Sequence, residues 1–211
     1  PATRDVRLRT IEDARPRGIC GSGIVDAIAE MFRSGIIDPS GRIKDNKGDK
    51  RVRKGPDGVR EYVLVWGKDT DTGEDITVAQ HDIEEIQLAK AAIFTGVSTL
   101  MRKLGVKCHD LKRVYAAGAF GTYVDASSAI TIGMYPDVPV TRIRFVGNAA
   151  GSGARMALKS THVRDLAERL SKKVEYIELA AEKDFQSEFA KAMFLPHRDA
   201  GRFPSVKTRR D

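Results

Sequence analysis

The sequence predicts an α/β layered fold, in which short strands alternate with helices along the chain. Segments with strand-like alternation are followed by segments with apolar residues at helical spacing. Three glycine-rich turns stand between such a strand and the next helix, at residues 18–23, 118–121 and 147–153. With 211 residues, of which 41% are hydrophobic and 31% charged, the chain can close one sizeable core or two small ones. This composition excludes the disordered and fibrous classes.

The N-terminal half is expected to contain a strand, a helix, a long loop and a hairpin. Residues 6–10 alternate apolar and basic side chains, which predicts an edge or half-buried strand. Apolar residues at helical spacing over 24–32 predict a helix that Gly35 ends. Residues 39–58 are rich in Gly, Pro, Asp and Lys and are expected to form a long surface loop. Strands at 62–66 and 76–78, joined by a turn-rich stretch, are expected to pair as a hairpin.

The longest predicted helix follows this hairpin. Asp82 is the expected N-cap, with Glu85 at the capping-box position. One apolar stripe then continues up to Gly105 through Ile86, Ile93, Val97, Leu100 and Leu104. We expect this stripe to face the core.

In the C-terminal half, residues 114–117 predict a buried central strand, and a short helix is expected to start near Asp125. A strand at 143–146, helices around 156–158 and at 161–170, a strand at 174–177 and an amphipathic segment at 185–194 follow. We therefore predict one lobe over residues 1–196, with the hairpin and a basic loop inserted at about 37–78. Residues 197–211 are expected to form a basic, mobile tail.

The charge and the cysteines limit the function classes. The net charge of +7 is concentrated in residues 42–54, with seven basic and two acidic side chains, and in residues 197–211, with five and two. Solvated charge in a loop and a tail explains this better than a nucleic-acid surface, so we expect neither nucleic acid nor membrane as a partner. Cys20 and Cys108 cannot build an iron–sulfur or zinc site alone, and the four histidines are expected at the surface. The chain has no membrane-length apolar run and no leader, which predicts a cytoplasmic protein; its start at Pro1 suggests a piece of a longer one.

The glycine-rich turns are the candidate binding elements. Glycine lets backbone N–H groups approach an anion at a helix N-terminus, where the helix dipole favours negative charge. A single turn of this kind is more often a packing feature, and the glycine spacing is neither that of a dinucleotide-binding fingerprint nor that of a Walker A loop. Three such turns in one chain favour a nucleotide-binding function.

Four ordered motifs resemble one family. They are GICGSGIVDA at 18–27, QHDIEEIQLAKAA at 80–92, AGAFG at 117–121 and GNAAGSGA at 147–154. Together they are similar to the C-terminal part of the ATP-dependent reductive activators of corrinoid proteins. The resemblance covers nearly all of residues 5–196. It implies an actin-like ATPase (RNase H-like) lobe of the acetate and sugar kinase, heat-shock ATPase and actin superfamily, with a mixed sheet flanked by helices and a β-hairpin insertion.

The resemblance implies a nucleoside contact at the second glycine turn. Gly118, Ala119, Phe120 and Gly121 match the superfamily's adenosine motif, in which the backbone passes close to the nucleoside. Thr122 departs from the Asn that this motif more often carries next, which puts a side-chain hydrogen bond there in doubt.

Other site residues are implied at the first glycine turn and on the long helix. Gly18, Gly21, Ser22 and Gly23 resemble the glycine loop of the dehydratase activators, a candidate for ribose or phosphate contact. Gln87 and Lys90 occupy the stretch that faces adenine and ribose in the superfamily, with a solvated helix face as the alternative. Residues 147–153 match the second interdomain connecting helix, whose implied role is hinge packing.

The resemblance also implies cofactors and partners. Family members use ATP with Mg²⁺ to drive an electron from an iron–sulfur centre to cob(II)alamin, which returns a methyltransferase's corrinoid protein to Co(I). The first phosphate loop, which holds the metal, and the iron–sulfur module have no counterpart in this sequence, so no catalytic or metal-binding residue is assigned here. We expect an N-terminal lobe, a ferredoxin-like module, a corrinoid protein and a second copy of the chain as partners. The alternatives are a docking module of the same fold that uses no nucleotide, and a small-molecule kinase.

Overall fold

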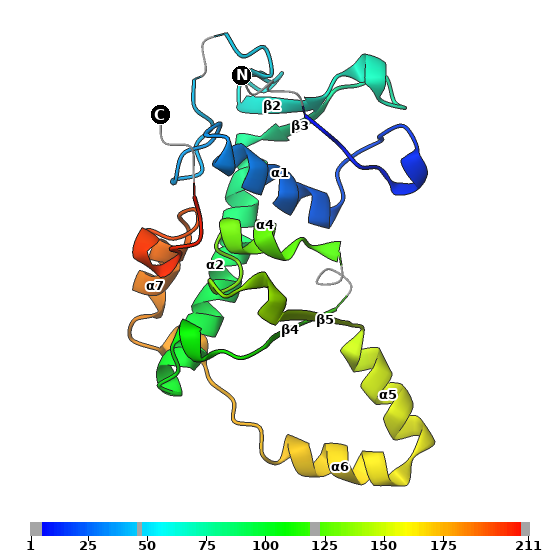
Figure 1. Ribbon diagram of the computed structural model, residues 1–211, viewed down its shortest axis with the longest axis vertical. Helices are drawn as coiled ribbons and strands as arrows, with labels where there is room; N and C mark the ends of the chain where they lie inside the picture. The colour runs from blue at the N-terminus through cyan, green and yellow to red at the C-terminus, as the bar shows by residue number, and fades with distance from the viewer. Residues whose placement is uncertain (1–5, 46–47, 119–122, 208–211) are drawn as a thin grey trace.

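The computed structural model describes residues 6–45, 48–118 and 123–207 (Figure 1). Helices and strands alternate in it, which confirms the predicted α/β class. The strands form two sheets, an antiparallel one of order β1-β2-β3 and a parallel pair of β4 and β5. The helices are α1 (Gly21–Arg33), α2 (Gln80–Lys103), α4 (Ala126–Thr131), α5 (Ala149–Lys159), α6 (Thr161–Ser171) and α7 (Phe185–Ala192). The strands are β1 (Val52–Lys54), β2 (Arg60–Val65), β3 (Ile76–Ala79), β4 (Val114–Ala117) and β5 (Ile143–Gly147).

The predicted hairpin is confirmed and carries a third strand. Strands β2 and β3 pair antiparallel with Tyr62 opposite Val78. The expectation of a surface loop over 39–58 is wrong in part, because β1 pairs with β2 inside this range. Ile43 in the same range is 1% exposed and bridges to Ile37. The sequence did not predict this strand, because residues 39–58 contain only single apolar residues among many charged ones and show no alternation of apolar and polar side chains.

Helix α1 also confirms its prediction, and Gly35 follows it with a φ of 75°. The strand expected at residues 6–10 is wrong. These residues form no ladder with another described strand, and most of their side chains are exposed. A short 3₁₀ turn, Ile11–Asp13, comes next. Alternation alone does not make a strand where no neighbouring backbone is available for pairing.

The long helix α2 is present, but its start and its buried face differ from the prediction. Ala79 is the N-cap, and Asp82 lies at the third helical position, where its carboxylate accepts the N–H of Ala79 at 2.8 Å. The apolar stripe lies largely outside the core, with Leu100 46% and Leu104 75% exposed. The buried face instead contains Ile83, Gln87, Lys90, Ala91, Phe94, Thr95 and Thr99.

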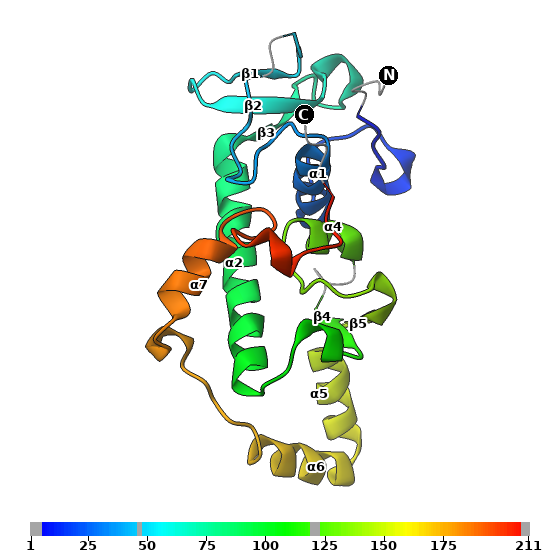
Figure 2. The ribbon, with the colours of Figure 1, turned by 60° about the vertical axis from the view of Figure 1, so that its left-hand side comes forward.

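The parallel pair of β4 and β5 confirms two predicted strands, yet β4 is not a buried central strand. Among the described residues β4 pairs with β5 alone, and the side chain of Tyr115 on β4 is 60% exposed. Helices α5 and α6 follow as predicted and pack on each other, away from the rest of the molecule (Figures 1 and 2). The strand expected at 174–177 is wrong: these residues are not in a strand, and Val174 and Tyr176 are 75% and 84% exposed.

The segment after α7 packs against the molecule over residues 197–207, although the sequence favoured a mobile tail. His197 and Phe203 are 3% and 2% exposed. Phe203 contacts the ring of Phe94 on α2, and Ser205 donates to Asp137. His197 is therefore a buried histidine, which corrects the expectation of four surface histidines.

Two apolar clusters hold these elements. One lies among α1, the three-stranded sheet and the start of α2, and the other joins the middle of α2 to α4, α7 and Phe203. Within the described residues, no helix combines the length and apolarity needed to cross a bilayer.

Candidate functional site

Gly118 and Gly147, the first residues of the second and third glycine turns, meet at one edge of the parallel sheet. Strands β4 and β5 run in the same direction, so their carboxyl ends lie side by side. The N–H of Gly118 donates to the carbonyl of Gly147 at 2.8 Å. The carboxyl edge of a parallel sheet is where α/β proteins bind ligands. Ala119, Phe120 and Gly121, together with Thr122, lie outside the described residues.

Both glycines at this junction adopt conformations that favour glycine. The φ angles are 96° at Gly118 and 62° at Gly147. A Cβ added at either position would meet no described atom within 4 Å. The space beside both glycines is therefore open, which suits the close approach of a ligand to backbone.

The third turn leads into a capped helix. Asn148 is the N-cap of α5, and its side chain accepts the N–H of Gly151 at 2.8 Å. Because this cap occupies one of the free N–H groups at the start of α5, the turn offers fewer donors to an anion than an uncapped helix. The hinge-packing role that the resemblance implies for residues 147–153 stays a prediction.

The first glycine turn opens onto a cavity of about 500 Å³. Cys20 is the N-cap of α1, and its side chain makes no cap hydrogen bond. Gly18, Cys20 and Gly21 line the cavity together with β3 and the carboxyl-bearing residues Asp82 and Glu85 of α2. Two carboxylates repel phosphate but accept hydrogen bonds from hydroxyl groups. The lining of this cavity therefore favours ribose over phosphate as the group that the first glycine turn is expected to contact.

Cys20 lies at the mouth of this turn and is exposed. Its sulfur is 3.3 Å from the hydroxyl oxygen of Ser22. The hydrogen bond with the Ser22 hydroxyl, helped by the N–H of Gly23, lowers the pKa of the Cys20 thiol. Ser22 and Gly23 thus direct polar hydrogens toward the start of α1, where negative charge is favoured.

Gln87 and Lys90 lie elsewhere, on the buried face of α2. Gln87 Nε2 donates to the carbonyls of Ser40 at 3.1 Å and Met193 at 2.6 Å. Lys90 Nζ donates to the carbonyls of Phe194 and Pro196, the latter at 2.8 Å. Lys90 is 0% exposed, and burial lowers its pKa to about 7.

The alternative of a solvated helix face is therefore wrong for both residues. Their donor groups are engaged by backbone carbonyls and tie α2 to the segment that follows α7. Contact of Gln87 and Lys90 with a nucleotide stays a prediction.

Sequence reasoning missed Asp26. Its Oδ1 atom is buried and has no hydrogen-bond partner among the described residues. Asp26 lies one turn after Ser22 and two turns before Arg33, on the same face of α1. Arg33 contacts α4, so this face of α1 is directed toward α4. A buried acceptor without a partner is a position that can receive a hydrogen-bond donor. Asp26 stands within the family motif at 18–27, but a single Asp on a helix has no pattern that marks it as a contact residue.

Among the described residues, no three His, Cys, Asp or Glu side chains gather closely enough to hold a metal ion. The site as described consists of backbone turns, one orphan carboxylate oxygen and a carboxylate-lined cavity. Such groups can accept hydrogen bonds from hydroxyl groups of a ligand and let a ligand approach the backbone closely.

Comparisons with known proteins identify relatives of this chain. A family model described as the C-terminal domain of RACo, the ASKHA domain, matches residues 1–207. The corrinoid activation enzyme RamQ of Eubacterium limosum is 39% identical over 186 residues, which are 85% of this chain and 31% of that protein. The Co(II) methylated amine-specific corrinoid protein reductase of Methanosarcina barkeri is 25% identical over 172 residues, which are 81% and 28% of the two chains.

A solved structure, a reductive activator for corrinoid, iron-sulfur protein, matches with a TM-score of 0.87 and 40% identity. The match covers 95% of this chain and 32% of the other. The chain thus spans about a third or less of the length of these relatives. The matches confirm the predicted actin-like fold, because they are to the ASKHA domain over nearly the whole chain. The chain belongs to the family of the C-terminal ASKHA domain of RACo, the reductive activators of corrinoid proteins.

Proposed function

We propose that this chain is the nucleotide-binding portion of an ATP-dependent reductive activator, which returns cob(II)alamin in a corrinoid methyltransferase protein to Co(I). The observation that carries the proposal is the junction of Gly118 and Gly147 at the carboxyl edge of β4 and β5, with open space beside both glycines. It lies in a family whose named relatives activate or reduce corrinoid proteins.

The proposal divides the nucleotide between the turns. The backbone of residues 118–121 contacts the adenine side of the adenosine, and the first glycine turn receives its ribose. Asp82 and Glu85 support this division, since carboxylates accept hydrogen bonds from ribose hydroxyls and repel phosphates. Asp26 does not line the cavity at this turn, and its buried Oδ1 offers the ligand a separate acceptor on the face of α1 that is turned toward α4. Bound ATP supplies the free energy for the uphill electron, while these residues bind and orient it.

The phosphates and Mg²⁺ are assigned to a second lobe outside this chain. Several exposed apolar side chains support a covering lobe: Leu104 on α2 is 75% exposed, Phe145 on β5 39% and Leu158 on α5 79%. Burial of such surface stabilises an interface, and large exposed patches mark interaction sites. The iron–sulfur cluster that donates the electron is likewise assigned to a ferredoxin-like module outside the chain.

The test measures corrinoid reduction by the full-length protein. Cob(II)alamin protein, a low-potential electron donor and the activator are mixed with ATP, with ADP or without nucleotide, and Co(I) is followed by its absorbance. We expect Co(I) to form in the sample that contains ATP, and not in the samples with ADP or without nucleotide. Asp26→Asn should weaken ATP binding by about tenfold, because the amide no longer offers two acceptor oxygens. Glu30→Gln, on the exposed part of the same helix, is the matched control.

Two alternatives predict other outcomes. If the chain is a docking module, Co(I) formation and binding to the corrinoid protein should be equal with and without nucleotide. Calorimetric titration with ADP should then release no heat of binding. A small-molecule kinase would consume ATP without corrinoid protein. Either result would overturn the proposal.

A further inference from the structure

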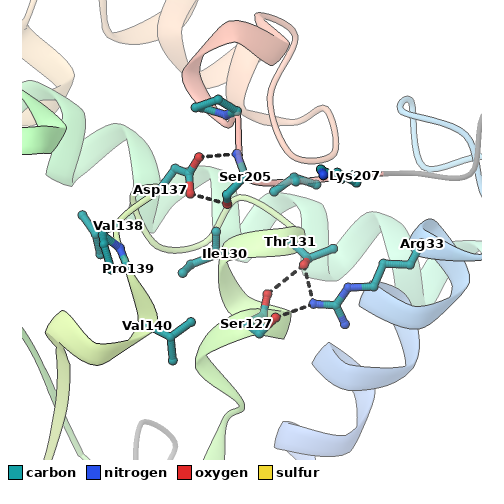
Figure 3. A pocket seen from close by; sticks show the side chains of 12 residues that line it. Arg33, Ser127, Ile130, Thr131, Asp137, Val138, Pro139, Val140, Ser205 and Lys207 are labelled. Carbon is teal, nitrogen blue, oxygen red and sulfur yellow. Dashed lines mark hydrogen bonds between the residues drawn. The ribbon is translucent and has the colours of Figure 1, made fainter.

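A cavity of about 590 Å³ lies apart from the glycine turns (Figure 3). Four segments that are distant in the sequence enclose it: the end of α1, helix α4, residues 137–140 and residues 204–207. Arg33, which lines it, is the last residue of α1, and Gly21 is the first. Twelve residues of helix place Arg33 about 18 Å from the first glycine turn. The cavity therefore belongs to a separate site.

The polar groups on the α4 side fix the direction of Arg33. Arg33 Nη2 donates to the hydroxyls of Ser127 at 2.8 Å and Thr131 at 2.6 Å. Thr131 is 4% exposed and donates its own hydrogen to the carbonyl of Ser127. Figure 3 shows the guanidinium reaching across from α1 to these two hydroxyls. The cation is thus held in one orientation at the wall of the cavity.

The hydrogen-bonding groups at this wall that have no partner among the described residues are donors. Arg33 also donates from Nη1 to Glu30, which leaves Nε–H and one Nη1–H without an acceptor in the described part of the chain. The hydroxyl hydrogen of Ser127 has no acceptor there either. Lys207, at the rim, adds an exposed ammonium group.

The acceptor in the lining is already occupied. Asp137 accepts the N–H of Ser205 at 2.9 Å and its hydroxyl at 2.5 Å. Glu30, the other carboxylate near Arg33, is 70% exposed at its side chain and does not line the cavity. The free donors of Arg33 and Ser127 and the ammonium group of Lys207 therefore have no hydrogen-bond acceptor among the described residues, although Asp137 keeps its negative charge in the lining.

The rest of the wall is apolar. In Figure 3 Val138 and Val140 lie across from Arg33, with Ile130 between them and Arg33, and Pro139, Pro204 and Val206 complete the apolar lining. The volume lies within the range of small-molecule sites, which are mostly apolar with a few convergent polar groups.

We propose that this cavity binds a small organic anion, with one carboxylate or phosphate group on an apolar body. The anionic group lies against Arg33 and the Ser127 hydroxyl, within reach of Lys207, because arginine presents paired donors to oxyanions. The apolar body packs against Ile130, Val138 and Val140.

The test uses the full-length protein and four probes, hexanoate, hexyl phosphate, 1-hexanol and inorganic phosphate, followed by saturation-transfer NMR and calorimetry. We expect at least one of the two amphipathic anions to bind with a Kd of about 1 mM or below, and hexanol and phosphate to bind at least about tenfold more weakly. The stronger of hexanoate and hexyl phosphate identifies the anionic group. Binding should persist when ATP is present, because the cavity is remote from the glycine turns.

Two variants on the exposed rim test the location without relying on Arg33, whose removal also breaks contacts between α1 and α4. Lys207→Gln removes a charge that attracts the anion, and Val140→Asp adds a charge that repels it. Each should weaken anion binding by about fivefold or more. Lys159→Gln, on α5, is the matched control and should change nothing. Hexanol binding as tightly as the anions, equal anion binding in all three variants, or no saturation by either anion at about 10 mM would overturn the proposal.

Discussion

Lys90 makes the stability of the chain depend on pH. Its pKa is about 7 in the folded chain, because the side chain is buried, and 10.5 in the unfolded chain. Between these values the unfolded chain binds more protons, so the free energy of unfolding rises with pH, by at most about 1.4 kcal/mol per unit. We expect urea denaturation between pH 7 and 10 to show this rise in the wild type and to lose it in Lys90→Met.

The exposed Lys159→Met serves as the control and should keep the wild-type dependence on pH. Lys90→Met should also be less stable than the wild type at pH 10, since the carbonyls of Phe194 and Pro196 lose their donor. If the free energy of unfolding rises equally with pH in Lys90→Met and in the wild type, groups other than Lys90 cause the pH dependence.

Gly118 and Gly147 offer a matched pair for testing the nucleoside contact. Both have a positive φ and open space at the Cβ position, so valine costs each a similar backbone strain of about 1–2 kcal/mol. Only Gly118 belongs to the proposed adenosine contact. We expect Gly118→Val to weaken ATP binding to the full-length protein by at least about tenfold more than Gly147→Val, as measured by calorimetry. Equal affinities in two variants of equal stability would leave Gly118 as a packing glycine.

At the scale of elements, the basic loop divides into structural and free cations. Arg53 pairs with Glu61 at 2.8 Å and Asp75 at 2.7 Å, which links β1 to β2 and to the start of β3. Arg51 donates to the carbonyls of Val63 and Leu64. Both guanidinium groups lie about 6 Å from the Trp66 ring, at 5.7 and 6.0 Å. Lys50 and Lys54 of this loop are exposed and available to a partner.

This division predicts that the same change of charge alters the stability of the chain at Arg53 but not at Lys54. Arg53→Glu should lower the free energy of unfolding by about 1–2 kcal/mol, because it places a third carboxylate beside Glu61 and Asp75. Lys54→Glu should leave stability within about 0.5 kcal/mol. If the hairpin docks an acidic corrinoid protein, Lys50→Glu with Lys54→Glu slows association at low salt, and the effect shrinks as salt rises. Stopped-flow association rates that do not change at low salt would leave the loop as a solvated insertion.

At the scale of the whole molecule, the described residues form an open arrangement. Helices α5 and α6 stand away from α2 in both views (Figures 1 and 2), and neither contains a buried residue. Apolar side chains on α2, β5 and α5 are exposed, among them Leu104, Phe145 and Leu158. A fold of this shape gains stability from a surface that covers it.

The same openness predicts that the 211-residue chain alone hydrolyses ATP negligibly. Positioning of metal, phosphate and water accounts for most of phosphoryl-transfer catalysis, and the proposal assigns these groups to another lobe. A coupled assay should show hydrolysis by the full-length protein with its corrinoid partner and background rates with the chain. Steady turnover by the chain, abolished by Gly118→Val, would contradict the prediction.

The sequence by itself determined the class of the fold, most helices and the hairpin. These follow from local patterns: helical spacing in α1, an Asp125 cap before α4, and two β-branched runs joined by a turn. The glycine turns were also visible, because glycine at a positive φ leaves a mark in the sequence.

Only the tertiary structure decided which face of α2 is buried and what the polar residues on it do. The apolar stripe predicted Ile93 and Leu104 inside, and the sequence left Gln87 and Lys90 to a ligand contact or a solvated face. Lys90 and Gln87 enter the core because distant backbone carbonyls accept their hydrogens. The packing of residues 197–207 and the orphan oxygen of Asp26 likewise depend on chain segments far away in the sequence. A local pattern records the propensity of a residue, whereas burial of a polar group depends on partners that only folding brings together.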